Sequence, residues 1–377
     1  MHYLKVSFKF RVRKFMKLFK SLLVAPATLG LLAPMSATAN EVTINDFNPA
    51  EELAITNSRV DGLEARLNNF EAGGFSDTTT ASFSVDASLG AIDGDTTTEA
   101  MVFEYQFNIG LSTSFTGEDS LDVAIDSGSD SAATADNPFS FDTGAALSVD
   151  GVTYSFPVGG ISMIVGNDTD ISASFTGACS YSAFTDYMGD CGTGNTIGKG
   201  GNGNTVTGSY AFDSGFSLAA GLSAEGDSSD GIITKEGSDS YGIEAAYTAD
   251  SWGVAVAYVS DDNAAAAETT SWGANATYSF ESADVSVGYE TQETSGADSS
   301  GYFVGLTFPE VGPGSVSVGM ATAGNFAEGA SELMTYEASY SYPVNDAMTI
   351  TPGIFIEETA VGSDDLTGIF TTVSFSF

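Results

Sequence analysis

The side chains that could do chemistry in this 377-residue sequence are carboxylates and two cysteines, with very few bases. The only histidine, His2, lies in an N-terminal stretch that we expect to be removed. Without histidine, Ser-His or Cys-His catalysis and histidine metal ligation are not available. The residue types therefore predict a protein that is not an enzyme and that holds no metal and no cofactor.

The first 39 residues have the composition of an export signal. They contain seven of the 11 basic residues and no acidic residue, followed by the apolar stretch "SLLVAPATLGLLAP" and the small residues Ala37-Thr38-Ala39. This order predicts a signal peptide over 1–39, with Met1 or Met16 as the true start. An uncleaved membrane anchor is the alternative, although the apolar run is short for it.

Removal of the signal leaves four bases and 50 acids, a formal charge of 4 − 50 = −46. A chain so acidic cannot neutralise phosphates, which excludes nucleic acid as a partner. Cations are the natural small partners of such a charge. The alternative is that the acidic residues only keep the surface soluble in a salty habitat. In an exported chain Cys179 and Cys191 are expected to form a disulfide.

A short helix is expected between the signal and the rest of the chain, in residues 40–75. After a linker, Val60, Leu63, Leu67 and Phe70 are spaced by three, four and three residues, as in a heptad seam. Gly73-Gly74 should end this helix. The seam predicts a small coiled coil that joins subunits, with three chains expected. A single amphipathic helix packed on a neighbour is the alternative.

Residues 76–377 alternate apolar and polar side chains with period two, which predicts strands. Aromatic residues stand at both ends of the apolar faces, and short turns alternate with long polar loops. Both features are typical of a transmembrane barrel with aromatic girdles. Lipid tolerates strands only in a closed barrel. The predicted fold is therefore all-β, a transmembrane antiparallel β-barrel of about 16 strands, with 14 as the next choice.

The last ten residues, "GIFTTVSFSF", read as the strand that closes this barrel. Their alternation places Val373, Phe375 and Phe377 toward lipid. A terminal Phe on an alternating strand resembles the signal by which the barrel-assembly machinery recognises outer-membrane barrels. That machinery is therefore an expected partner.

Polar side chains that alternate with the lipid-facing residues must point into the barrel. An ionised carboxylate in lipid costs several kcal/mol, so the interior should hold water. The alternative is that the acids cluster at the rims and leave the centre neutral. The expected pore-lining residues are Glu104, Gln106, Asn108, Glu244, Asp284, Glu290, Glu337 and Glu357.

One irregular stretch, "FTGACSYSAFTDYMGDCGTGNTIGKGGNGNT", interrupts the strand pattern. We expect it to fold into the pore as a constriction loop braced by the Cys179–Cys191 disulfide, with Lys199 as a lone positive charge near an acidic path. An external loop stapled against proteolysis is the alternative. The constriction residues would be Tyr181, Asp186, Tyr187, Asp190 and Lys199.

The stretch "FNPAEELAITNSRVDGLEARLNNFEAGGFSDTTT" resembles the junction of cyanobacterial outer-membrane porins. The barrel of that group is similar to the carbohydrate-selective, OprB-type porins. The resemblance implies a homotrimer in outer-membrane lipid that passes small hydrophilic solutes passively. Such relatives usually carry a surface-layer-homology domain before the junction, whereas here about 20 residues separate the signal site from the helix, which leaves open whether this chain anchors to the wall.

These observations together predict an outer-membrane porin for small hydrophilic solutes that favours cations. Four other functions compete: a structural barrel without significant transport, a sugar-selective channel, a barrel enzyme, and a secreted calcium-binding solenoid. The structural barrel would need a wall-binding domain. For the sugar-selective channel, the resemblance supplies no sugar-binding motif that could be matched to residues of this sequence. An enzyme built on a Ser-His pair would need a histidine. A secreted calcium-binding solenoid would need regular repeats, but "KGGNGNT" occurs once.

Overall fold

The computed structural model describes residues 79–94, 100–129, 141, 144–201, 203–225, 232–233, 237–262, 267–359 and 363–377. The predicted signal peptide over 1–39, the linker and the helical seam of Val60, Leu63, Leu67 and Phe70 lie outside these residues. Within them, no helix is long and apolar enough to cross a membrane.

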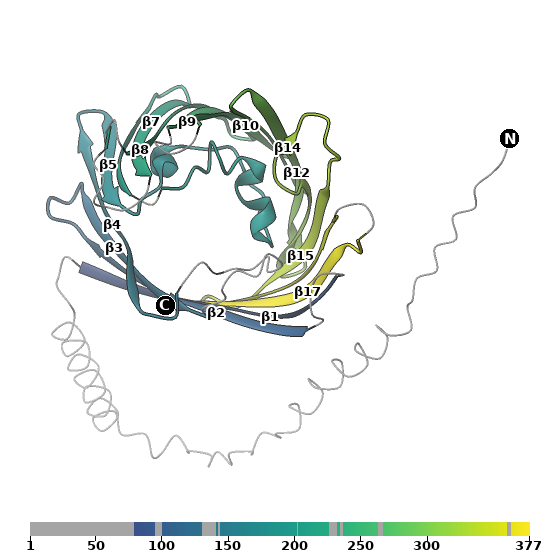
Figure 1. Cartoon of the computed structure of the whole chain (residues 1–377). Coiled ribbons are helices and arrows are strands. Elements are labelled where there is room, and N and C mark those ends of the chain that lie inside the picture. The colour runs from purple at the N-terminus through teal and green to yellow at the C-terminus, as the bar shows by residue number, and fades with distance from the viewer. Residues whose placement is uncertain are drawn as a thin grey trace, which may run out of the picture. The chain divides into compact units, whose positions relative to one another are not determined.

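Sixteen long strands form one antiparallel sheet that closes on itself, so the predicted barrel and its strand number are confirmed (Figure 1). Each strand pairs with its neighbour in sequence, and β1 pairs with both β2 and β17. The short β14 (Phe326–Ala327) lies in the connection between β13 and β15 and adds onto β12. The long strands are β1 (Thr79–Asp93), β2 (Ala100–Thr113), β3 (Ser120–Gly128), β4 (Ser148–Val158), β5 (Ile161–Asn167), β6 (Asn204–Ala211), β7 (Phe216–Glu225), β8 (Ser238–Thr248), β9 (Trp252–Asp262), β10 (Thr269–Ser279), β11 (Asp284–Thr294), β12 (Ala297–Val311), β13 (Gly314–Thr322), β15 (Met334–Asn345), β16 (Met348–Glu357) and β17 (Leu366–Ser376).

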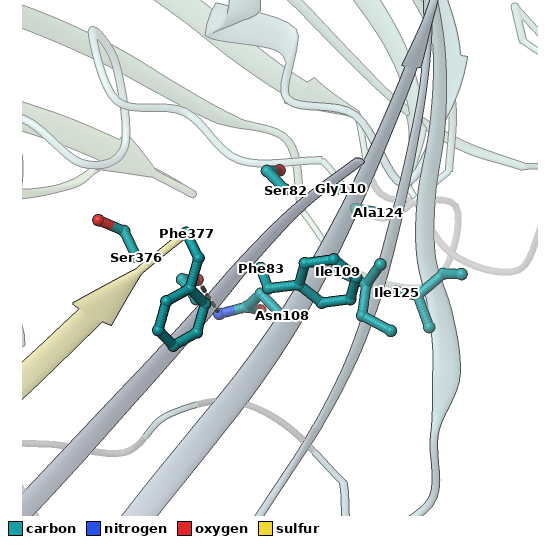
Figure 2. A pocket seen from close by; sticks show the side chains of 10 residues that line it. Ser82, Phe83, Asn108, Ile109, Gly110, Ala124, Ile125, Ser376 and Phe377 are labelled. Atoms are coloured by element: carbon teal, nitrogen blue, oxygen red, sulfur yellow. Dashed lines mark hydrogen bonds between the residues drawn. The ribbon is translucent and has the colours of Figure 1, made fainter. Parts of the chain in front are cut away.

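The last residue of the chain closes the barrel. Phe377 and Phe83 exchange backbone hydrogen bonds, with N···O distances of 3.1 Å and 2.9 Å. In Figure 2 the Phe377 ring lies beside Phe83 at the end of β17, with Ile109 and Ile125 on the next two strands. The register places Val373 opposite Ala87 and Phe375 opposite Val85, on the same outward face.

The two faces of the sheet are inverted relative to a soluble protein. Large apolar side chains point outward and are exposed, as for Ile243 (56%) and Trp272 (54%). Polar side chains on the inner face are buried, as for Ser271 (0%) and Ser286 (1%). A wide apolar exterior with a polar interior is the arrangement that a lipid bilayer selects.

Connections at the two ends of the barrel differ in length. At one end Gly159–Gly160, Gly312–Pro313 and Asp346–Ala347 make two-residue turns, and both ends of the described sheet, at β1 and Phe377, lie there. The opposite end carries the longer connections, with one exception. Ser295–Gly296 joins β11 to β12 in a tight turn at that end. The expected alternation of short turns and long loops therefore holds except at this hairpin.

Candidate functional site: a segment folded into the barrel

The connection between β5 and β6 turns into the barrel instead of staying outside it (Figure 1). We call residues 168–201 the inner segment. It contains two short 3₁₀ helices, η3 (Ile171–Ser174) and η4 (Asp186–Gly192). Its first run crosses the inner wall from β7 to β15, and its second run returns toward β9. The inner segment contains both cysteines and all five predicted constriction residues.

Glu337 of β15 fastens the far end of the first run. Its carboxylate accepts hydrogen bonds from the backbone N–H of Phe184 (2.7 Å) and of Thr185 (2.9 Å). It also accepts the hydroxyls of Thr185 (2.6 Å) and Tyr181 (2.9 Å). Hydrogen bonds to an ionised acceptor are roughly twice as strong as neutral ones. This contact therefore fixes the chain where it reverses direction.

Two further carboxylates and one amide hold the middle of the inner segment. Glu244 of β8 accepts the backbone N–H of Thr176 (2.6 Å) and Gly177 (2.8 Å). Asn275 of β10 accepts the N–H of Ala178 (2.7 Å). Glu290 of β11 accepts hydrogen bonds from the return run at 2.7–3.0 Å, from Asn195 N, Asn195 Nδ2 and Thr196 Oγ1.

These three glutamates do not stand in open water, although the sequence pattern predicted them as lining residues. They point inward as expected, but Glu244, Glu290 and Glu337 are only 1–3% exposed because the inner segment covers them. A buried carboxylate is tolerated only when hydrogen bonds satisfy it, and the segment's N–H groups supply these bonds. The sequence could not distinguish a wall acid that faces water from one that binds a second layer of chain.

The two runs are tied to each other and to the barrel at two more places. Cys179 of the first run and Cys191 of the second form the expected disulfide, with Cα atoms 5.9 Å apart. Lys199 forms an ion pair with Asp261 of β9 at 3.1 Å. Lys199, expected as a lone positive charge near an acidic path, is thus paired with a carboxylate of the wall. It is the only Lys or Arg in the part of the chain that the structure describes.

Glycines on the inner face of the wall are contacts that the sequence reading missed. Eight strands each place one buried glycine beneath the inner segment, which we call the glycine row. At most of these positions an added methyl group would overlap the segment, for example Ile171 over Gly221 and Met188 over Gly319, where Sδ would be 2.7 Å away. The row comprises Gly221, Gly242, Gly253, Gly273, Gly288, Gly305, Gly319 and Gly353.

The predicted constriction residues differ in where they face. Asp186 and Asp190 are exposed, and Tyr187 is half-buried. Tyr181 is buried, with its ring edge-on to Phe303 at 5.0 Å, so it packs the segment and does not face solvent. Burial and the Glu337 charge raise the pKa of Tyr181. Although Asp190 is exposed as a residue, its carboxyl group lies against Gly198, and the resulting loss of hydration, with the nearby charge of Asp170, raises its pKa.

The remaining predicted lining residues lie away from the fastening contacts. Glu104, Gln106 and Asn108 are on the inner face of β2. Asp284 and Glu357 are the first residue of β11 and the last of β16, so both lie at rims. The register places three further acids on the inner face of β1 and β3, since directly opposed residues share a face. These are Asp86 beside Gln106, Asp122 beside Ser112, and Asp126 beside Asn108.

A closed barrel with one connection folded inside it places this chain in the class of membrane channel barrels. A family model described as Gram-negative porin matches residues 71–353, and the chain belongs to that family. It is an outer-membrane porin, which passes solutes by passive diffusion. The expected resemblance to porins is thus confirmed.

Three solved structures share the fold at low sequence identity. Pseudomonas putida OprB is 12% identical with a TM-score of 0.61, covering 80% of this chain and 94% of its own. A loop-deletion mutant of Vibrio cholerae OmpT is 11% identical, with a TM-score of 0.57 and coverages of 80% and 100%. An anion-selective porin from Comamonas acidovorans is 14% identical, with a TM-score of 0.57 and coverages of 80% and 99%.

One curated protein is also similar, the uncharacterized protein alr4550 of a Nostoc strain. The two are 36% identical over 110 residues. That match spans 28% of this chain and 18% of the Nostoc protein.

Proposed function

We propose that this porin favours cations, and that the inner segment narrows its lumen against the wall formed by β1 to β3. The observation that carries the proposal is the balance of charge. Asp86, Glu104, Asp122 and Asp126 lie on the inner wall, and Asp186 and Asp190 on the inner segment. Within the described residues the only base, Lys199, is paired with Asp261.

The location of these acids supports a path on one side of the barrel. Glu244, Glu290 and Glu337 are covered by protein, and Glu104 and Asp126 of the β1–β3 wall are also buried (5% and 6% exposed). Asp86, Gln106, Asn108 and Asp122 keep part of their surface accessible. Solvent can therefore approach the β1–β3 wall. Fixed carboxylates along a water path raise the local cation concentration and lower that of anions. Pore width then sets the size limit for neutral solutes.

Charge neutralisation tests this assignment. The variant Asp86→Asn/Asp122→Asn/Asp126→Asn should move the reversal potential in a KCl gradient toward zero while the conductance stays large. The matched control neutralises three exposed acids near the short turns, as Glu118→Gln/Glu310→Gln/Asp346→Asn. Equal shifts in both variants would mean that rim charge, and not the β1–β3 wall, determines selectivity.

We further propose that three copies assemble, joined in part through the seam of Val60, Leu63, Leu67 and Phe70. The heptad spacing of these four residues supports it. Chemical cross-linking in native membranes should give a trimer ladder, and Leu63→Asp/Leu67→Asp should weaken it. A monomer in the unaltered protein would contradict the proposal.

A further inference from the structure

The glycine row places the inner segment unusually close to the barrel wall. A glycine inside a strand weakens the strand and often marks a place where another part of the chain approaches closely. Here the approach is direct. A methyl group at Gly288 of β11 would overlap the backbone carbonyl oxygen of Cys191, and one at Gly273 of β10 would overlap the hydroxyl of Thr196.

The glycine row and the carboxylates that bind the inner segment lie on the same strands or on directly paired strands. Gly288 and Glu290 are both on β11, and Gly319 of β13 pairs directly with Glu337 of β15. The carboxylates draw the segment toward the wall, and the missing side chains permit the short distance. The hydrogen bonds to the carboxylates and the free space above the glycines together determine the distance between the inner segment and the barrel wall.

We propose that the glycine row sets the width of the pore, with Gly273 and Gly288 as the main positioning residues. The inference rests on the proposed constriction by the inner segment. A side chain at either glycine displaces the segment toward the β1–β3 wall and narrows the path between them. Neither glycine touches the permeating solute, so the effect acts through the position of the segment.

The two positions differ in what a new side chain would meet. At Gly288 the obstacle is the main chain of Cys191, a residue with no exposed surface that is tied by the disulfide. It cannot rotate away. At Gly273 the obstacle is the side chain of Thr196, whose hydroxyl donates to Glu290. Removal of that side chain should therefore restore the space.

The test is a series of single-channel conductances on the full protein. Restoring an ordinary contact of about 3.5 Å requires the segment to move by about 1 Å or more. Because conductance falls with the open cross-section of the pore, Gly288→Ala should then lower conductance by roughly 10–20%, and Gly288→Val by about two to three times as much. Vesicles that contain these variants should also swell more slowly in solutions of sugars near the size limit of the pore. This rate should fall by a larger factor than the conductance.

Rescue separates positioning from general damage. Gly273→Ala should lower conductance in the native background and leave it unchanged in a Thr196→Gly background. Gly288→Ala should not be rescued by Thr196→Gly. The control is Gly144→Ala in the connection between β3 and β4, where nothing lies within 4 Å of the new methyl group. Heat-modifiable gel migration identifies variants that retain the barrel.

The results distinguish two failures. If the unaltered protein carries no current, the proposed function itself fails. If it conducts and folded Gly288→Ala and Gly288→Val keep or exceed its conductance, the glycine row does not set the pore width. A Gly273→Ala defect that persists without the Thr196 side chain would also overturn the inference.

Discussion

Thr185 donates both its backbone N–H and its hydroxyl to the same carboxylate oxygen of Glu337, at 2.9 Å and 2.6 Å. This pair joins the turning point of the inner segment to β15, across 152 residues of sequence. Both residues are at most 3% exposed. The position of the segment thus depends on a contact that no local pattern encodes.

Loss of the Glu337 charge should destabilise the porin. In Glu337→Gln the amide nitrogen faces N–H and O–H donors, so the variant should lose about 3 kcal/mol in free energy of unfolding. Urea unfolding of protein refolded into lipid vesicles measures this loss. The control Glu310→Gln, at an exposed position, should stay within about 0.5 kcal/mol of the native protein. Equal stability of the two variants would contradict the fastening role.

The disulfide should keep the two runs of the inner segment together. In the chain-entropy model a bridge with a sequence separation of 12 contributes about 3 kcal/mol. Cys179→Ser/Cys191→Ser should therefore keep a heat-modifiable barrel but show larger open-channel current noise. A reducing agent should produce the same noise in the native protein and leave the variant unchanged. Quiet currents in both cases would mean that the carboxylates alone hold the segment.

Acidification should reduce the cation preference. The raised pKa of Asp190 means that this residue becomes neutral at a higher pH than an ordinary aspartate. Its negative charge is therefore lost early as the pH falls. Reversal potentials measured from pH 7 downward should show two differences between Asp190→Asn and the native protein. The variant should have a weaker cation preference at pH 7, and its cation preference should fall less over the first steps of acidification.

The same shift has a consequence for stability. Because the folded state holds the Asp190 proton more tightly than the unfolded state, this residue's contribution to stability falls as the pH rises. Asp190→Asn should then be slightly more stable than the native protein at pH 7. A less stable variant would argue against a raised pKa.

Phe377 should matter for assembly more than its exposed ring suggests. Deletion of Phe377 removes both backbone hydrogen bonds to Phe83 and the terminal aromatic residue. The yield of folded barrel in outer membranes should fall, whereas Phe377→Tyr should retain it. Full yield of the deleted form would show that the machinery and the closure of the barrel do not depend on this residue.

The barrel could be predicted from the sequence because lipid imposes a strict alternation on each strand. In β8, Tyr241 and Ile243 point outward and Glu244 inward, and no long-range information is needed to assign them. The disulfide was predictable because only two cysteines exist. The strand number followed from counting such alternations.

The arrangement inside the barrel could not be predicted in the same way. Whether Glu290 faces water or binds Asn195 depends on how a distant, irregular stretch folds. Gly273 and Gly288 look like ordinary strand glycines until the segment is seen above them. One signal was available: buried glycines recur on the inward positions of β7 to β13, whereas β2 carries Glu104, Gln106 and Asn108 there.

The most direct test of the account is the reversal potential of the unaltered mature protein in a planar bilayer under a KCl gradient. The acidic wall and the paired state of Lys199 predict a large single-channel conductance with a potential on the cation-selective side. A potential of zero, or one on the anion-selective side, from protein that conducts would contradict the proposed acidic path.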